Sequence, residues 1–292
     1  MTDKIKEALA FRNISETLPQ DAVVACQGTE GAYSQYAYEK LFTGGTQNIM
    51  YFESFSMVFN AVNKGMCRYG ILPLENSLQG SVTEVYDLMH EHSFHIVRSA
   101  KVKIDHALLA NHGSFAPGIV KILSHEQALA QCSGFIRNLK NVKIEKCANT
   151  AVAARSVSQS GRTDIAAIAN LNCAGLYNLS VLSRDIQNNP NNYTRFICIS
   201  KELEIYPHAD KISIMFTLPH KPGSLYEFIG KFANIGVNLA KLESRPIPGS
   251  DFEFMFYAEM DAAIGSEGIL ELFKQLSERG GVFTFLGNYA EV

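Results

Sequence analysis

Ile71-Leu72-Pro73-Leu74-Glu75-Asn76-Ser77-Leu78-Gln79-Gly80 joins a short apolar stretch to three consecutive polar side chains. Proline cannot donate a hydrogen bond within a central strand, so we expect the strand to end near Pro73. The carboxylate, amide and hydroxyl then lie at a strand-to-helix junction, where binding groups collect in open α/β sheets. The stretch therefore predicts an α/β fold with a ligand site at the end of this strand.

A second polar run, Asn191-Asn192-Tyr193-Thr194-Arg195-Phe196, stands far along the chain, immediately before another apolar stretch. It offers a hydroxyl beside a guanidinium. Taken together, the two runs predict a site for a small anion that carries more than one charge.

The composition is that of an ordinary soluble globular protein, with 292 residues of which 47% are hydrophobic and 19% charged. The net charge of −3 argues against general nucleic-acid binding, which needs a basic excess. The first seven residues mix charge signs without an apolar core, so no signal peptide is expected, and no apolar run is long enough to span a membrane. Six scattered cysteines without a C-x-x-C pair predict reduced thiols in a cytoplasmic protein.

Strand and helix signals alternate in two consecutive sets over the first two thirds of the chain. This alternation predicts parallel sheets flanked by helices, and two sets predict two lobes with a cleft between them. Phe196–Ser200 is predicted as a strand that returns the chain to the first lobe, and Gln127–Leu139 as one long helix. After a polar linker the pattern becomes βαββαβ, which predicts a ferredoxin-like module with an antiparallel sheet and helices on one face.

Several runs resemble, in order, the motifs of prephenate dehydratases: Gln27-Gly28-Thr29-Glu30-Gly31-Ala32-Tyr33-Ser34, Pro73-Leu74-Glu75-Asn76-Ser77, Ser124-His125-Glu126-Gln127-Ala128-Leu129-Ala130-Gln131-Cys132 and Thr194-Arg195-Phe196. The last third resembles the ACT regulatory domain fused to those enzymes, through Pro222-Gly223-Ser224-Leu225 and Glu243-Ser244-Arg245-Pro246. The resemblance covers about residues 21 to 288, and four catalytic motifs in order, followed by an ACT module, are a specific signal. One departure is His125-Glu126-Gln127, where the family usually has His-Pro-Gln; we interpret it as a surface change at a helix start.

The resemblance implies a two-lobed, periplasmic-binding-protein-like α/β catalytic domain followed by an α+β ferredoxin-like (βαββαβ) ACT domain. We expect an N-terminal arm over residues 1–20, a catalytic domain over 21–202 and an ACT domain over 211–289. Within the catalytic domain, one lobe spans about 21–103 plus 190–202 and the other about 104–189. No chorismate mutase domain fits ahead of residue 21, so a monofunctional enzyme is expected.

By resemblance, the activity is decarboxylative dehydration of prephenate to phenylpyruvate in L-phenylalanine biosynthesis. Prephenate carries two carboxylates and a ring hydroxyl, and aromatisation of its ring drives the reaction. The protein must orient the substrate, recognise its carboxylates and assist the departing hydroxyl. No cofactor is expected for this chemistry. His90, His92 and His95 lack further ligands at a fitting spacing, so no metal site is expected either.

The resemblance assigns the leading catalytic role to Thr194. A threonine hydroxyl is a very weak acid, so we expect it to donate a strong hydrogen bond or to relay a proton to the leaving hydroxyl; its structural alternative is to satisfy a strand end. Arg195 either clamps a substrate carboxylate or orders the loop through a salt bridge. Glu75 is expected to be protonated or to pair with Arg195, and its alternative is to cap the next helix. Asn76 and Ser77 complete the predicted catalytic set.

Predicted substrate-binding residues lie at two helix starts and beside Thr194: Gln27, Gly31, Ser34, Thr150 and Phe196. Glycines in the first turn let backbone N–H groups approach an anion, although the dinucleotide-binding spacing is absent. Thr150 opens a helix, where its hydroxyl either helps to bind a carboxylate or simply caps the helix.

In the ACT domain the resemblance implies feedback inhibition by L-phenylalanine, held between two modules of a homodimer or homotetramer. The implied phenylalanine site consists of Gly223, Ser224, Leu225, Asn238, Glu243, Ser244, Arg245 and Pro246. Backbone groups at the helix start would take the ligand carboxylate, and Asn238 and Glu243 its ammonium.

Two other functions stay open at this point. An arogenate dehydratase would share every motif, because its substrate differs only in an amino in place of a keto group; the glycine-rich turn also resembles the plant-type enzymes with that preference. A non-catalytic amino-acid sensor is the third reading, and the intact Thr194-Arg195-Phe196 run argues against it.

Overall fold

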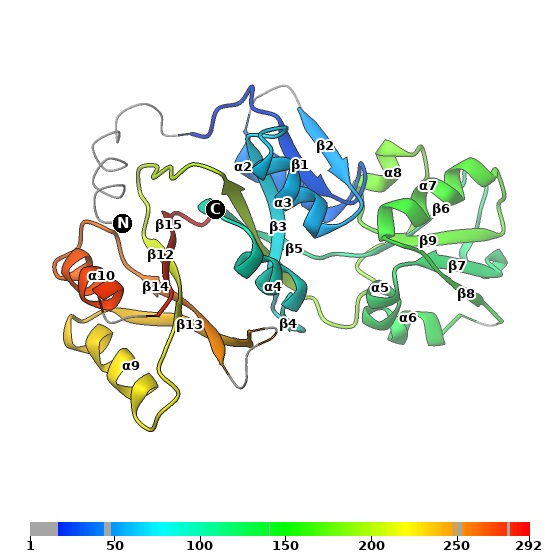
Figure 1. Ribbon diagram of the computed structural model, residues 1–292. Helices are drawn as coiled ribbons and strands as arrows, with labels where there is room; N and C mark the ends of the chain where they lie inside the picture. Colours follow the sequence, from blue (N-terminus) through cyan, green and yellow to red (C-terminus); the bar gives the residue numbers. More distant parts are fainter. Residues whose placement is uncertain (1–16, 44–47, 140, 248, 250–252, 279–280) are drawn as a thin grey trace.

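The computed structural model describes residues 17–43, 48–139, 141–247, 249, 253–278 and 281–292 (Figure 1). Of the N-terminal arm expected over residues 1–20, only residues 17–20 are described. The described chain forms three sheets, and the first lobe lies between the second lobe and the C-terminal domain. No helix among the described residues is long and apolar enough to cross a membrane.

The first lobe is a mixed sheet in the order β2-β1-β3-β11-β5, with short β4 paired to β3. Its strands are β1 (Val24–Gln27), β2 (Ile49–Phe52), β3 (Tyr69–Asn76), β4 (Gly80–Ser81), β5 (His95–Lys103) and β11 (Tyr193–Ser200). Its helices are α2 (Tyr33–Leu41), α3 (Phe55–Asn63) and α4 (Thr83–Glu91). Buried residues of α2 pack on one face of the sheet, while α3 and α4 cover the other.

The second lobe is a five-stranded sheet in the order β10-β6-β9-β7-β8. Its strands are β6 (Ala107–Ala110), β7 (Lys121–Ser124), β8 (Lys143–Lys146), β9 (Ile165–Ala169) and β10 (Ser180–Ser183). Its helices are α5 (Glu126–Gln131), α6 (Ser133–Arg137), α7 (Thr150–Ser160) and α8 (Asn172–Leu176), with a 3₁₀ turn η1 (Ala116–Gly118). The predicted two-lobed architecture is therefore confirmed, but both sheets contain antiparallel pairs where parallel sheets were expected, because β11 runs back through the first sheet and β6 enters the second from its opposite end.

The C-terminal domain has the predicted βαββαβ order: β12 (Lys211–Thr217), α9 (Ser224–Asn234), β13 (Asn238–Pro246), β14 (Phe254–Asp261), α10 (Ile269–Glu278) and β15 (Phe283–Tyr289). The four strands are antiparallel in the order β13-β14-β12-β15. Helices α9 and α10 pack on one face of this sheet. The other face joins the hydrophobic core of the first lobe, where Met215, Met255 and Tyr257 pack with residues of α3 and α4.

The last residues of the C-terminal domain also form main-chain hydrogen bonds with the first lobe. Val292 donates its N–H to the carbonyl of Ser99 and accepts a hydrogen bond from Lys101, so the chain end extends the sheet beside β5. Gly287 of β15 approaches β5 so closely that a Cβ there would lie 2.1 Å from the Ile96 carbonyl oxygen. The two units are therefore held together by main-chain contacts as well as by side-chain packing.

Three local predictions were wrong. Strand β3 continues past Pro73 to Asn76, because its pairing with β1 is already over at Ile71 and a β-bulge opposite Arg195 and Phe196 accommodates the proline. Strand β11 begins at Tyr193, so Thr194 and Arg195 lie within a strand. The single helix expected over Gln127–Leu139 is two short helices.

The break between these two helices lies at Cys132. There the Asn188 side chain accepts a hydrogen bond from the N–H of Gly134 and donates to the Ala130 carbonyl. It thereby satisfies main-chain groups that a continuous helix would have paired.

Candidate active site

Both polar runs of the sequence end at the same edge of the first sheet. Strands β1 and β3 are parallel, so Gln27 and Asn76 lie at corresponding ends. Strand β11 runs antiparallel to β3 and begins at that edge, which places Thr194 directly opposite Asn76. The topology alone therefore brings together residues separated by more than a hundred positions in the sequence.

A single amide links these two strands. The Asn76 Nδ2 donates hydrogen bonds to Thr194 Oγ1 at 3.0 Å, to the Tyr193 carbonyl at 3.1 Å and to Asn192 Oδ1 at 2.8 Å. The Oδ1 of the same side chain accepts from the N–H groups of Leu78 and Gln79. Main-chain N–H groups can only donate, so they fix the orientation of the Asn76 amide. Thr194 must then accept at its oxygen, and its own proton is left to donate elsewhere.

Ser77 strengthens the same junction. Its hydroxyl accepts a hydrogen bond from the Tyr193 N–H at 2.9 Å and lies 3.3 Å from the Asn191 carbonyl, while its N–H donates to the Tyr193 carbonyl. We conclude that Ser77 holds the start of β11 against the turn after β3.

The second lobe presents helix N-termini toward this edge. Strands β7 and β8 are parallel, so α5 and α7, which follow them, begin on the same side of the sheet. The N-cap of α7 is Asn149, whose side chain accepts from the Val152 N–H at 2.8 Å. Because Asn149 supplies the cap, the hydroxyl of the nearly buried Thr150 is not needed for capping, and it has no protein partner among the described residues. A helix N-terminus with an uncommitted hydroxyl suits a carboxylate.

The glycine-rich turn after β1 lies against these helices. Gly31 has φ +84°, and a Cβ there would lie 3.0 Å from both Cys173 Sγ and Leu176 Cδ2 of α8. Its carbonyl accepts a hydrogen bond from Asn170 Nδ2 across the lobes, and its N–H donates to Gln35 Oε1. The absence of a side chain at Gly31 thus allows the two lobes to pack closely together. Ser34 is also engaged, because its hydroxyl donates to the Gln27 carbonyl at 2.7 Å.

Sequence reasoning missed the residues that join the two lobes. Tyr36 donates to Asn170 Oδ1 at 2.6 Å, Tyr177 donates to the Glu30 carbonyl at 2.6 Å, and Gln127 donates to Gln79. Asn170 directly follows the fully buried strand β9, which is the same polar-after-strand signal that singled out Ser77. A polar residue directly after a buried strand could therefore have marked Asn170 as a site residue from the sequence alone.

Arg195 points away from this edge, toward the C-terminal domain. Its guanidinium pairs with Glu75 at 2.7 Å and with Glu259 of β14. A third carboxylate, that of Glu291, lies 3.9 Å away, and all three lie on the side of the C-terminal domain. Burial disfavours the charge of Arg195, but Glu259 and Glu75 outweigh it and raise the pKa of the guanidinium. Of the two roles considered for Arg195, the structure contains the salt bridge.

Glu75 pairs with Arg195 and with Lys241 of β13, and it does not cap a helix. Burial raises the pKa of the Glu75 carboxyl, but the hydrogen bond from Lys241 and the charge of Arg195 prevail, and the pKa is lowered. Of the two alternatives considered for Glu75, the structure contains the pair with Arg195, and the lowered pKa favours the ionised carboxylate. Phe196, predicted to touch substrate, instead lies buried in the apolar core between the sheet and α2.

The family model for prephenate dehydratase matches residues 24–204. The chain is 35% identical over 278 residues to arogenate dehydratase/prephenate dehydratase 2 of Arabidopsis thaliana, covering 91% of this chain and 72% of that protein. The chain belongs to the prephenate dehydratase family. Membership confirms the predicted enzyme class, a hydro-lyase of phenylalanine biosynthesis.

Two solved structures share the fold over 92% of this chain. Prephenate dehydratase from Arthrobacter aurescens in complex with L-Phe has a TM-score of 0.83 and 28% identity, with 90% of that chain covered. GqqA, described as a novel type of quorum-quenching acylase, has a TM-score of 0.82 and 29% identity, with 98% of that chain covered. The same fold thus occurs with a second activity, so the reaction of a prephenate dehydratase must be argued from its site residues.

The residues predicted to bind phenylalanine separate into two groups. Ser224 and Leu225 line an open pocket of about 610 Å³ beside the start of α9, together with Pro219, Glu253 and Phe256. Gly223 precedes them as the N-cap, with φ +87°. Asn238, Glu243 and Arg245 are engaged elsewhere: Asn238 donates to Asp261, Glu243 accepts from Ser81 at 2.8 Å, and Arg245 pairs with Asp87. None of these three residues lines the pocket.

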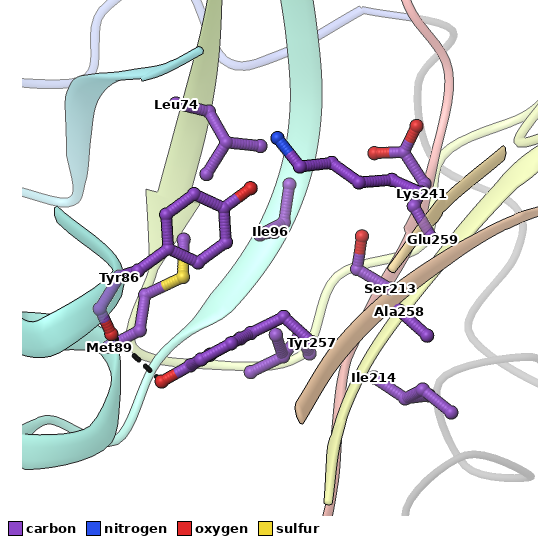
Figure 2. Close-up of a pocket in the computed structure, with 11 residues that line it drawn as sticks. Leu74, Tyr86, Met89, Ile96, Ser213, Ile214, Lys241, Tyr257, Ala258 and Glu259 are labelled. Atoms are coloured by element: carbon purple, nitrogen blue, oxygen red, sulfur yellow. Dashed lines mark hydrogen bonds between the residues drawn. The ribbon is translucent and has the colours of Figure 1, made fainter. Parts of the chain in front are cut away.

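The contacts of Glu243 and Arg245 follow from the alternation of β13. Lys241, Glu243 and Arg245 point to the first lobe, whereas the intervening Leu242, Ser244 and Pro246 lie on the opposite side of the strand. Figure 2 shows the Lys241 side chain reaching from the C-terminal domain toward the ring of Tyr86, 5.2 Å from its centroid. The cavity left between the two units has about 20 Å³ open to a water molecule, enough for one water, so the interface is closely packed.

Among the described residues, no three His, Cys, Asp or Glu side chains gather in a way that could hold a metal ion. His92, from the trio considered in the sequence, stacks on Phe59 with ring centroids 5.1 Å apart. All six cysteines are free thiols.

Proposed function

We propose that this chain converts prephenate to phenylpyruvate with Thr194 as the donor to the leaving hydroxyl. The observation that carries the proposal is the hydrogen bond from Asn76 Nδ2 to Thr194 Oγ1, with the Asn76 amide fixed by two main-chain N–H groups. Because the threonine oxygen already accepts, its proton is directed away from Asn76. A positioned donor of this kind assists departure of a hydroxyl without a cofactor.

The substrate carboxylates need separate partners. Thr150 and the N-terminus of α7 offer a hydroxyl, main-chain N–H groups and a favourable helix dipole. Arg195 is committed to Glu75 and Glu259, so the proposal assigns it to the domain interface and leaves carboxylate recognition to the helix N-terminus. Here residues 21–202 are the catalytic unit and 211–289 the regulatory unit.

Arogenate dehydratase is the competing activity, and the name of the Arabidopsis relative includes both substrates. The two substrates differ by a keto or an ammonium group, and Asn76, Ser77 and Thr194 would treat the shared ring alike. The deciding experiment measures turnover of prephenate and arogenate in parallel by the purified protein. A higher kcat/KM for prephenate supports the proposal, a higher value for arogenate replaces it, and no turnover of either would favour an amino-acid sensor.

We further propose that L-phenylalanine binds the pocket beside α9 and inhibits the enzyme as an ACT-domain effector. The α9 N-terminus can take the ligand carboxylate, and Ser224 Oγ is buried there without a hydrogen-bond partner in the described part of the chain. Glu253 is the carboxylate that lines this pocket and is placed to take the ammonium. Movement of β13 would reach the catalytic lobe through Lys241, Glu243 and Arg245, which contact Glu75, Ser81 and Asp87.

A homodimer or homotetramer is the expected assembly. Edge strand β13 has no partner beyond β14 in the described sheet, and apolar Leu225, Tyr226, Ile229 and Leu242 are exposed on or near that side, Tyr226 at 82%. A second copy of this domain would cover them. Tyr226→Asp should reduce the mass measured by light scattering to that of a monomer, whereas Met66→Asp, at an exposed residue of the first lobe, should leave it unchanged. The free cysteines are consistent with the expected cytoplasmic location.

The regulatory proposal is tested by adding phenylalanine to the prephenate assay and to a thermal melt. Inhibition together with a raised Tm is expected, since a ligand that binds the folded state stabilises it. If saturating phenylalanine changes neither activity nor Tm, the regulatory proposal is wrong while the catalytic one stands.

A further inference from the structure

Asn192 lies behind the Asn76–Thr194 contact and takes no part in the function proposed so far. It is 1% exposed and immediately precedes β11. Its Oδ1 accepts the shortest of the three hydrogen bonds that Asn76 Nδ2 donates, at 2.8 Å, and its main-chain carbonyl accepts from the Ile104 N–H at 2.8 Å. The main chain of Asn192 is thus held by Ile104, the residue that follows β5, and its side chain is held by Asn76.

The orientation of the Asn192 amide follows from its neighbour. Asn76 must present Nδ2 to Asn192, because its Oδ1 is held by the Leu78 and Gln79 N–H groups. Asn192 must therefore present its oxygen, since two amide nitrogens facing each other would place donor against donor. Its Nδ2 is then left buried without a partner among the described residues. An unpaired buried donor is unfavourable for stability, so the residue is not explained by stability alone.

We infer that Asn192 is a positioning residue for the proposed dehydration, acting through Asn76 to set the direction of the Thr194 proton. Asn76 has two N–H hydrogens and three acceptors within 3.1 Å, so at least one hydrogen is shared. Asn192 Oδ1 accepts one Nδ2 hydrogen, and the other Nδ2 hydrogen is shared between Thr194 Oγ1 and the Tyr193 carbonyl. Without the Asn192 acceptor, the Nδ2 hydrogen that it binds is released to the Tyr193 carbonyl and Thr194 Oγ1. The hydrogen bond to Thr194 Oγ1 then loses its fixed direction, and the Thr194 hydroxyl can rotate its proton away from the leaving group. This inference rests on the proposed function.

The test compares Asn192→Leu, which keeps the volume but removes the acceptor, with Asn192→Asp, which keeps the acceptor and removes Nδ2. Asn191→Ala is the matched control, because Asn191 is the adjacent, exposed asparagine and its side chain makes no hydrogen bond with any described residue. For prephenate, Asn192→Leu should lower kcat about 10²-fold with KM nearly unchanged, a size typical of a misplaced catalytic group. Asn192→Asp should recover most of that kcat, and Asn191→Ala should match the wild type.

Three results would overturn the inference. An unchanged kcat in Asn192→Leu, with only a lowered Tm, would mean that Asn192 is merely structural. A raised KM in Asn192→Asp with kcat no better than in Asn192→Leu would mean that Nδ2 contacts the substrate directly. If Asn192→Leu does not fold, Asn192→Ser, whose hydroxyl is too short to reach Asn76, replaces it with the same expectation. Wild-type protein that turns over neither prephenate nor arogenate would reject the proposed function itself, which separates that failure from the others.

Discussion

Thr194 and Arg195 are neighbours in one strand, yet their side chains act on opposite sides of the first lobe. Thr194 meets Asn76 at the edge that faces the second lobe, while Arg195 joins Glu75 and Glu259 at the C-terminal domain. The difference arises because successive side chains of a strand point to opposite faces. A short motif can therefore contain one residue for chemistry and one for domain contact.

The side chains of strand β3 also point to the two sides of the first lobe, and a β-bulge changes their alternation. Arg195 is opposite Glu75, but Phe196 is opposite Pro73, so Leu74 is the extra residue of a β-bulge. The bulge turns Glu75 to the same side as Leu74, where it meets Lys241, and leaves Asn76 facing Thr194. The strength of this division can be tested by removing one side at a time.

The largest effect is expected on the side of Thr194. Thr194→Val keeps the shape but removes the hydroxyl, and should lower kcat for prephenate by about 10²–10⁴-fold, the usual contribution of a positioned proton donor. Thr194→Ser, which keeps the hydroxyl, should retain most of the activity. Steady-state kinetics and a thermal melt of both variants check this, and a Thr194→Val enzyme with near wild-type kcat would remove Thr194 from the chemistry.

On the other side, Arg195→Met should act mainly on stability. It removes the nearer of the two cations beside the buried Glu259 and leaves only Lys211, at 3.9 Å, which should reduce the free energy of unfolding by about 3–5 kcal/mol in a denaturant titration. Adding Glu259→Gln should restore part of that loss, because the buried charge is then gone. If Arg195→Met instead raises KM for prephenate at unchanged stability, the arginine clamps a substrate carboxylate after all.

A smaller effect on stability is expected when the pH is lowered. The pKa of Glu75 is lowered from its ordinary value of 4.5 in the folded state, so its pairing stabilises the fold above that pH. This contribution is lost as the pH falls below 4.5 and through the folded-state pKa. Glu75→Gln should therefore be less stable than the wild type at pH 7, with the difference shrinking in melts taken toward pH 3. A difference that is constant with pH would contradict the ion pair.

The smallest effect is expected at the rim of the interface. The Arg245–Asp87 pair is partly exposed, so Asp87→Asn should change the free energy of unfolding by less than about 1 kcal/mol. It should nevertheless shift the phenylalanine concentration needed for half inhibition, because the pair links β13 to α4. Asp164→Asn, which breaks a comparable pair with Arg162 in the second lobe, is the control and should leave that concentration unchanged. Equal shifts in both variants would argue against transmission through β13.

Much of the fold could be predicted because its signals are local. Phe196–Ser200, predicted as a strand that returns the chain to the first lobe, lies in β11 of that lobe's sheet, and the βαββαβ order of the last third was predicted correctly. The start of β11 was missed because Tyr193, Thr194 and Arg195 show no apolar pattern, and their strand is defined by pairing with β3 and β5. The separation of α5 from α6 depends on Asn188, which lies more than fifty residues away.

The residue types needed for the chemistry can be recognised from the amino-acid order alone: a hydroxyl at Thr194, an amide at Asn76 and a helix start at Thr150. Their proximity in the chain to strand and helix ends is enough to mark them, since backbone propensities and apolar patterns are local. The direction in which each side chain points depends on contacts between distant parts of the chain. Arg195 meets Glu259 and Asn76 meets Asn192 through pairings over sixty residues or more, and a single bulge at Leu74 sets the side on which Glu75 lies.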